Sequence, residues 1–323
     1  MEELENRIDL TEFSDKVNEL KDKIGETIVG QEESVDLLLT TLLADGHVLL
    51  EGVPGVAKTL LAKLTAKLIQ ADFSRIQFTP DLMPSDVLGT SVFNLKNSDF
   101  EFVKGPVFSE IVLIDEINRA PAKTQAALFE VMEERQVTVD GFTRKMGDVY
   151  MVIATQNPVE QEGTYRLPEA QLDRFLMKVV LDYPKGEEEF TILKRHQENN
   201  RLTKLENIQP VLTKEELLRF RDLAKQVYVE DSILKYITDI ILATRNNKAV
   251  YLGASPRAGV AVLNSAKAYA ILQGRDFVIP DDVKYIAVPV LQHRLVLSAE
   301  TEMEGRSAAN ITKLLIEKID VPK

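Results

Sequence analysis

The chain is 323 residues long, with 45% hydrophobic residues, 28% charged residues and a formal net charge of −12. This length predicts about two domains, and the apolar content is sufficient for a sizeable core. The acidic balance lacks the basic footprint of nucleic-acid-binding proteins, which counts against such a partner without excluding a local basic pore. Because the chain has no cysteine, disulfides, thiol catalysis and cysteine-ligated zinc are excluded.

Signals for a histidine metal site, a membrane span and export are also missing from the sequence. The three histidines, His47, His196 and His293, lie in separate predicted elements without metal-ligand spacing, so we expect no histidine metal site. The longest apolar runs, such as Ile111–Ile114 and Val149–Ala154, are far shorter than the ~20 residues of a membrane-spanning helix. The first ten residues lack the basic and apolar regions of a signal peptide. We therefore expect a cytoplasmic protein without a membrane span.

The first half of the chain alternates short apolar runs with helical stretches. Residues Thr11–Ile24 predict an amphipathic helix, since apolar residues recur there at helical spacing. The alternation that follows predicts an α/β fold with crossover connections and a mostly parallel, five-stranded sheet. The expected strands are His47–Leu50, Arg75–Thr79, Ile111–Asp115, Val149–Thr155 and Leu176–Leu181, and the helices between them include Thr59–Ile69 and Lys123–Glu134.

The pattern changes after Tyr183, where strand signals stop and helices follow one another. Thr213 and Glu216 form a capping-box signature for a helix that runs to about Val227. Pro256 and Pro280 suit the first turns of later helices. We therefore predict an α/β domain over residues 1–185 and a smaller all-helical domain over residues 186–323. Two hairpins are expected within the first domain, near Thr90–Phe102 and within Gln136–Val149, the latter with Asp140-Gly141 as its turn.

The strongest motif lies directly after the first predicted strand and opens a helix. It reads Gly52-Val53-Pro54-Gly55-Val56-Ala57-Lys58-Thr59. A phosphate chain needs converging backbone amides, which such a loop and a helix N-terminus supply together. The residues expected to bind it are Gly52, Pro54, Gly55, Val56, Ala57, Lys58, Thr59 and Leu60.

Two side chains of this loop have specific expected tasks. Lys58 can reach the β- and γ-phosphates, and the Thr59 hydroxyl can hold Mg²⁺. The usual motif has glycine before the lysine, and here Ala57 stands in that position. Alanine tolerates right-handed helical torsions, so the loop is expected to survive if Ala57 is helical. The alternative, an ordinary Gly-Pro-Gly turn, is disfavoured by the strand before the motif and the helix after it.

Two acids, Asp115 and Glu116, follow the buried apolar strand Ile111–Ile114. Ligands of open α/β sheets bind at the carboxyl ends of the strands. We expect Asp115 to hold Mg²⁺, directly or through water, and Glu116 to polarise the water that attacks the γ-phosphate. Asn157 follows the next buried strand. Its amide either aligns that water and senses the γ-phosphate or only shapes an Asn-Pro turn, and the residues alone favour neither.

Five further stretches, taken in chain order, carry a resemblance to a known protein family. They are Gly46–Gly55, Asp115–Pro121, Ala154–Pro158, Leu167–Phe175 and Gly253–Ala258. Together with the phosphate loop, they resemble the AAA+ ATPases, and specifically the MoxR family, over nearly the whole chain. The combination is far more specific than any single motif.

The resemblance implies roles that spacing alone does not assign. Val29 and Gly30, followed by Gln31, resemble the segment that lines the adenine. Asn157 resembles sensor 1, Arg174 the arginine finger that reaches a neighbouring subunit's γ-phosphate, and Arg257 sensor 2. Guanidinium groups suit both tasks, because they stay charged and can contact phosphate oxygens bidentately.

Two other arginines leave the assignment of the finger open. Arg119 and Arg166 lie near Arg174 in sequence, and an isolated arginine more often forms a surface salt bridge than a catalytic contact. Arg166 also stands where the family usually has proline. The two expected hairpins resemble the family's helix-2 insert and the hairpin before sensor 1, which in related proteins face the pore or the partner.

The resemblance implies an ATP hydrolase with ATP and Mg²⁺ as cofactors. It also implies a homo-oligomer, a hexameric ring, that remodels, matures or assembles partner proteins in a chaperone-like way, with a von Willebrand factor A domain partner. The alternatives are a nucleic-acid motor of the helicase type, a magnesium-chelatase-type ATPase subunit and a nucleotide-dependent scaffold that scarcely turns over. The acidic balance counts against the motor, and the presence of Glu116 counts against the scaffold.

Overall fold

The computed structural model describes residues 8–96, 98–158, 165, 167–198 and 208–322. Its centre is a five-stranded sheet in the order β2-β5-β8-β1-β9, in which each strand runs parallel to its neighbours. The predicted sheet is confirmed, and the strand ends differ from the predicted ones by at most two residues. The strands are β1 (Val48–Gly52), β2 (Phe73–Gln77), β5 (Ile111–Asp115), β8 (Met151–Gln156) and β9 (Met177–Leu181).

The sheet separates two hydrophobic clusters because successive side chains of a strand point to opposite faces. In β5, Ile111 and Leu113 join one cluster, whereas Val112 and Ile114 join the other. All five residues of β5 are buried. A strand covered on both faces is apolar throughout, which is why its sequence shows a continuous apolar run.

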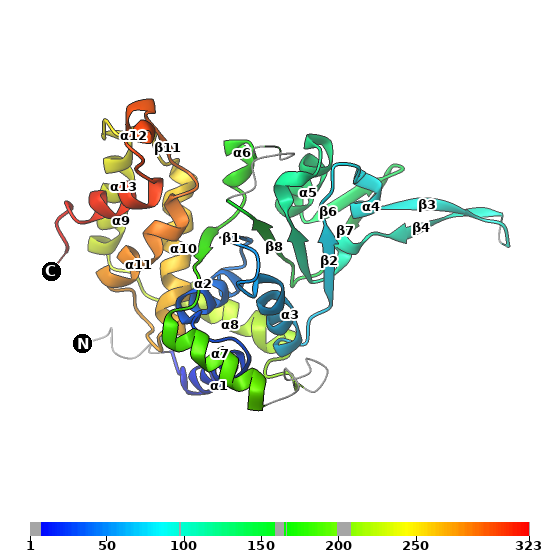
Figure 1. The fold of residues 1–323 in the computed structure, drawn as a ribbon, viewed down its shortest axis with the longest axis horizontal. Coiled ribbons are helices and arrows are strands. Elements are labelled where there is room, and N and C mark those ends of the chain that lie inside the picture. Colours follow the sequence, from blue (N-terminus) through cyan, green and yellow to red (C-terminus); the bar gives the residue numbers. More distant parts are fainter. Residues whose placement is uncertain (1–7, 97, 159–164, 166, 199–207, 323) are drawn as a thin grey trace.

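Helices cover both faces (Figure 1). On one face lie α1 (Thr11–Thr27), α2 (Glu32–Leu43) and α3 (Lys58–Leu68), and on the other lies α5 (Ala122–Glu134). The predicted first helix is confirmed and buries the apolar residues on which its prediction rested. The short helices α4 (Pro84–Leu88) and α6 (Glu169–Leu172) and the 3₁₀ turns Pro106–Phe108 and Ile117–Arg119 complete this part.

Both predicted hairpins are present. The pair β3 (Gly89–Asn94) and β4 (Asp99–Lys104) projects from the body of the molecule (Figure 1), while β6 (Gln136–Val139) and β7 (Phe142–Lys145) are joined by a two-residue turn. That turn has positive φ at Asp140 (53°) and Gly141 (79°), as a type I′ turn requires.

The two hairpins touch each other. The Ser91 hydroxyl of β3 donates to the Asp140 carboxylate at 2.5 Å, and the Arg144 guanidinium of β7 lies 3.8 Å from the centre of the Phe102 ring of β4. Large apolar side chains near the end of β3–β4 are exposed, Leu95 by 85% and Phe100 by 69%. The two hairpins are therefore linked, and the projecting end of β3–β4 is partly apolar.

The described residues after β9 are mainly helical, and we refer to this part as the lid region. Its helices are α7 (Gly186–Glu198), α8 (Lys214–Gln226), α9 (Asp231–Arg245), α10 (Pro256–Leu272), α11 (Pro280–Leu291), α12 (Ala299–Met303) and α13 (Ala308–Ile316). The capping box at α8 is confirmed, since the Thr213 hydroxyl accepts from the Glu216 amide and the Glu216 carboxylate accepts from the Thr213 amide. Among the described helices, none has the length and apolar content needed to span a bilayer.

The lid differs from the sequence prediction in one detail. It contains a small antiparallel sheet, β10 (Val250–Leu252) with β11 (Val296–Leu297), in addition to helices. Strands of two or three residues are too short to show the alternation by which strands are recognised. The boundary at 185/186 stays a prediction, because one hydrophobic cluster continues from the sheet into the lid helices.

Candidate functional site

The carboxyl ends of three parallel strands meet at one edge of the sheet. β8 lies between β1 and β5, with Thr155 opposite Leu50 and Ala154 opposite Ile114. Neighbouring strands are about 4.8 Å apart, so the ends of β1 and β5 are separated by about 10 Å. The loop after β1, the acids after β5 and Asn157 after β8 therefore converge on the edge where α/β proteins bind ligands.

The loop between β1 and α3 depends on two glycines. A Cβ at Gly52 would lie 2.7 Å from the Leu181 carbonyl oxygen of β9, so only glycine allows this close approach. Gly55 has φ of 93°, a conformation that side chains with a Cβ rarely adopt. Lys58 Nζ donates to the carbonyl oxygen of Gly52 and, at 3.3 Å, to that of Val53. The Lys58 side chain therefore folds back over the first residues of the loop.

Ala57 does not meet the condition under which the loop was expected to tolerate alanine. That condition was right-handed helical torsions, but Ala57 has φ of 63° and ψ of 19°, which is the left-handed region. A Cβ in this region costs about 1–2 kcal/mol. The chain turns sharply at this residue so that α3 can begin at Lys58, and the alanine methyl is held in a conformation that glycine adopts without cost.

The N-terminus of α3 fits a phosphate chain. Its first turn has no side-chain cap and no acidic residue, but it contains Lys58 and Thr59. The free backbone amides and the helix dipole give this end a positive potential. A Mg²⁺ ion is commonly held by one carboxylate, a hydroxyl and phosphate oxygens, so Thr59 and Asp115 form a suitable partial ligand set.

Asp115 is buried, with 6% of its surface exposed, and is fixed by two neighbouring strands. Its Oδ2 accepts from Arg75 Nε of β2 at 2.5 Å, and its Oδ1 accepts from the Thr155 hydroxyl of β8 at 3.2 Å. Neither Arg75 nor Thr155 was predicted from the sequence to belong to the site. The available signal was the polar pair at positions 75 and 77, which share one face of a strand.

Glu116 is held beside Asp115 in a left-handed conformation with φ of 58°. Its amide donates to the Thr155 hydroxyl at 3.1 Å. Its carboxylate accepts from Gln77 Nε2 at 2.8 Å and pairs with Arg119 Nε at 3.2 Å. Gln77 was also missed from sequence. Arg119, one alternative for the finger, therefore contacts the acid of its own chain, and Arg166, the other, lies outside the described residues.

The segment of Val29 and Gly30 is fixed against the end of β9. The Gln31 amide donates to the Asp182 carbonyl oxygen at 3.0 Å, and Gly30 has φ of 74°. Glu188 fills the space above Gly30, where a Cβ would lie 2.4 Å from its Oε2. Because β9 pairs with β1, this segment lies near the start of the phosphate loop, and its contact with adenine stays a prediction.

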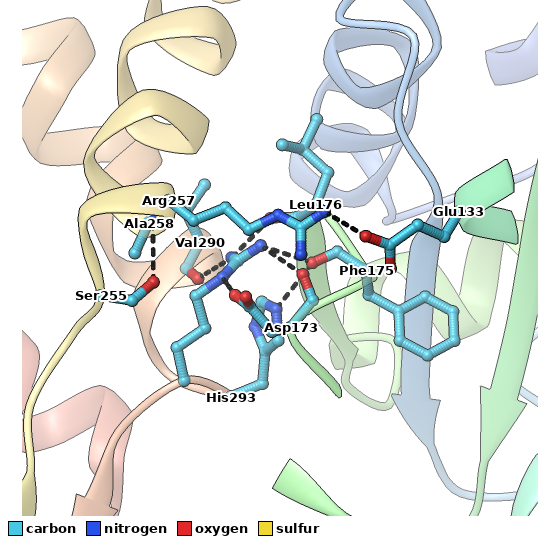
Figure 2. A network of polar contacts seen from close by, with 10 residues as sticks. Glu133, Asp173, Phe175, Leu176, Ser255, Arg257, Ala258, Val290 and His293 are labelled. Atoms are coloured by element: carbon cyan, nitrogen blue, oxygen red, sulfur yellow. Dashed lines mark hydrogen bonds and ion pairs between the residues drawn. The ribbon is translucent and has the colours of Figure 1, made fainter. Parts of the chain in front are cut away.

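The other two arginines meet on one carboxylate, which Figure 2 shows beside Arg257. Arg174 Nη1 is 2.5 Å from Glu133 Oε2, and Arg257 Nη2 is 2.8 Å from Glu133 Oε1. Arg174 lies just before β9, Arg257 lies in the first turn of α10, and Glu133 lies in the last turn of α5. The Arg257 hydrogen bond, together with the charges of both arginines, holds the pKa of Glu133 below its usual value.

This arginine pair lies at the amino ends of the strands. It lines a cavity of about 360 Å³ together with Gly46 and His47, which lead into β1, and the Leu176 amide donates to the His47 carbonyl oxygen at 2.8 Å. The phosphate loop leaves the opposite end of β1. Five residues of strand span about 16 Å, so Arg174 and Arg257 are a full strand length from the phosphate loop of their own chain.

A phosphate loop, two acids and a polar amide at one edge of a parallel sheet, with a helical lid, define a P-loop nucleotide-binding core of the AAA type. Residues 47–177 match the ATPase family associated with various cellular activities (AAA), and residues 242–314 match the AAA lid domain.

Relatives extend this match along the chain. An uncharacterized protein of Bacillus subtilis (strain 168), YeaC, is 48% identical over 93% of this chain and 92% of its own length. Chaperone MoxR1 of Mycobacterium tuberculosis is 41% identical over 93% of this chain and 81% of its own length. A crystal structure from Cytophaga hutchinsonii, of a protein proposed to be an ATPase, has a TM-score of 0.88 and 42% identity over 97% of both chains. The chain belongs to the MoxR family of AAA+ ATPases.

Proposed function

We propose that this chain hydrolyses ATP with Mg²⁺ at the edge formed by β1, β8 and β5. The phosphate loop and the N-terminus of α3 bind the phosphates, with Lys58 on the β- and γ-phosphates. Thr59 and Asp115 hold the metal, which offsets the charge of the phosphate oxygens when it is bound. Glu116 orients and polarises the attacking water, and the buried Asn157 senses the γ-phosphate. The geometry that supports this is the convergence of these groups on one sheet edge.

The site is completed by a neighbouring subunit. The observation that carries this proposal is the position of Arg174 and Arg257, at the sheet edge opposite the phosphate loop of their own chain. Arginines there cannot serve their own nucleotide, but they can serve the nucleotide of an adjacent copy. The resemblance assigned Arg257 to sensor 2, and its pairing with Glu133 beside Arg174 supports action on the neighbour together with the finger. Such a head-to-tail contact closes into a ring, and we propose a hexamer.

Mixing two inactive variants tests this arrangement. Lys58→Ala is expected to lose nucleotide binding, and Arg174→Ala is expected to bind ATP but lose about 10³–10⁵ in turnover. In a mixed assembly, an Arg174→Ala subunit receives Arg174 from a Lys58→Ala neighbour. Random mixing in equal amounts should restore about one quarter of the wild-type rate, because one neighbour pair in four has this order. Turnover that stays at the level of the separate variants would refute a shared site.

The biological role we propose is chaperone-like remodelling, maturation or assembly of partner proteins, in the cytoplasm. It is supported by membership of the family and by the name of the relative from Mycobacterium tuberculosis, a chaperone. The resemblance adds a von Willebrand factor A domain protein as the partner. Nucleotide-dependent contacts of Asn157, Arg174 and Arg257 would bias the orientation of lid and core, so that hydrolysis drives the cycle.

Affinity capture with Glu116→Gln in the presence of ATP tests this role, since the variant binds but does not hydrolyse. We expect enrichment of a von Willebrand factor A domain protein or its client over the wild type. Lys58→Ala, which lacks the ATP state, is the matched control. Stoichiometric nucleic acid in the captured complex, with salt-dependent stimulation of turnover, would instead identify a nucleic-acid motor.

A further inference from the structure

Among the described residues, Glu133 is the only carboxylate that forms an ion pair with Arg174 or Arg257. The cavity beside them is lined by four arginines and three carboxylates. Two of these carboxylates are already engaged: Asp45 pairs with Arg135 at 3.0 Å, and Asp173 pairs with Arg294 at 2.6 Å. Glu133 thus serves two guanidinium groups with one negative charge, and the cluster keeps an excess positive charge.

Arg174 also has unused donor capacity. Its Nη1 donates to the Phe129 carbonyl oxygen at 2.8 Å in addition to the Glu133 contact, but its Nε is buried without a hydrogen-bond partner in the described part of the chain. A buried donor without a partner costs free energy that a suitably placed acceptor recovers. The arginine pair is therefore only partly satisfied by Glu133.

The two ion pairs of Glu133 and the Asp173–Arg294 pair differ in how readily they separate. The Arg294 side chain is only 5% exposed and donates to Asp173 and to the carbonyl oxygens of Phe175 and Leu176. By contrast, the side chains of Arg174, Glu133 and Arg257 are 28%, 32% and 61% exposed. Partly exposed pairs contribute little and exchange partners readily, whereas the Asp173–Arg294 pair is a fixed connection between core and lid.

We propose that Glu133 is a releasable counter-ion for Arg174 and Arg257: in the separate subunit it holds the two arginines, and phosphate oxygens of the neighbouring subunit's nucleotide replace it on assembly. This inference rests on the proposed function, in which the pair acts on a neighbour. A triphosphate offers more negative charge and more acceptor oxygens than one carboxylate, so it outcompetes Glu133 once it is within reach. Glu133 then sets the nucleotide concentration at which subunits assemble, and it connects that exchange to the lid through Arg257.

The test is assembly of the purified chain with a non-hydrolysable ATP analogue, followed by sedimentation velocity. Glu133→Gln keeps the shape of the side chain and removes its charge. It should lower the analogue concentration at half-assembly about three- to tenfold, which is the range that two partly exposed ion pairs support. Glu134→Gln removes the same charge from the next residue, which has no ion pair among the described residues, and should leave the midpoint unchanged.

The arginines must be necessary for the effect. In an Arg174→Ala, Arg257→Ala background, adding Glu133→Gln should not move the midpoint. A Glu133→Gln chain that assembles at the wild-type concentration, or that needs more analogue, would overturn the counter-ion role. If the Arg174→Ala and Arg257→Ala variants assemble and turn over like the wild type, the shared site itself fails, and the inference about Glu133 fails with it. If the arginine variants are impaired while Glu133→Gln behaves like the wild type, only the counter-ion role of Glu133 is refuted.

Discussion

Replacing Ala57 by glycine should stabilise the protein although it removes a methyl group. Ala57 has φ of 63° and ψ of 19°, where a Cβ costs about 1–2 kcal/mol. Glycine avoids that cost but gives the unfolded chain more freedom, which removes about 0.5–1 kcal/mol of the gain. The net expectation is a rise of about 1 kcal/mol in the free energy of unfolding, measured by urea denaturation without nucleotide.

Ala126→Gly is the matched control. Ala126 is exposed in the interior of α5, where the torsions are right-handed, so the same change should lower the free energy of unfolding by about 1 kcal/mol. The two variants should therefore shift the urea midpoint in opposite directions. Equal destabilisation by both would show that Ala57 is not strained in solution, and the reasoning from its left-handed torsions would be refuted.

Three further expectations concern side chains around the sheet. Burial lowers the pKa of His47 to about 4. Well above pH 6.5 the His47 imidazole is neutral in the folded and the unfolded chain, and at lower pH the unfolded chain takes up the proton, so His47 should lower stability by about 2 kcal/mol between about pH 7 and pH 5; urea denaturation of His47→Gln should show a smaller fall. Arg294→Met should lower the free energy of unfolding by about 3–5 kcal/mol in the same assay, because Asp173 loses its buried partner. A loss below about 1 kcal/mol would contradict a fixed Asp173–Arg294 connection between core and lid. Gln77→Ala should reduce turnover up to about 100-fold with unchanged ATP affinity, because Glu116 loses its orienting amide; normal turnover would remove Gln77 from the site.

The sequence was sufficient for the sheet and for the position of the loop between β1 and α3. Buried parallel strands are continuous apolar runs, so Ile111–Ile114 identified β5 directly, and the loop motif depends on residues that are adjacent in the chain. The capping box at Thr213 and the first-turn prolines of α10 and α11 were predictable for the same reason, since each signal spans a single turn.

The features that were missed depend on tertiary structure. Alanine has no intrinsic preference for left-handed torsions, and at Ala57 the requirements of the loop override its propensity. The contacts of Arg75 with Asp115 and of Arg257 with Glu133 join residues 40 and 124 positions apart, which no local pattern encodes. The resemblance of the sequence pointed to Arg174 and Arg257. Only the fold shows that both pair with Glu133, a strand length from the phosphate loop of their own chain.

The polarity of β1 has a consequence for counting active sites. One end of this strand leads to the loop that receives phosphate, and the other end lies beside the two arginines. With the shared site that we propose, the subunit at one terminus of an open row would lack donated arginines, and the subunit at the other would present its arginines to solvent. An open row therefore always has one complete centre fewer than it has subunits, whatever its length. Closure adds that last centre without any new chemistry, so specific activity per chain should rise most steeply for the smallest closed assemblies.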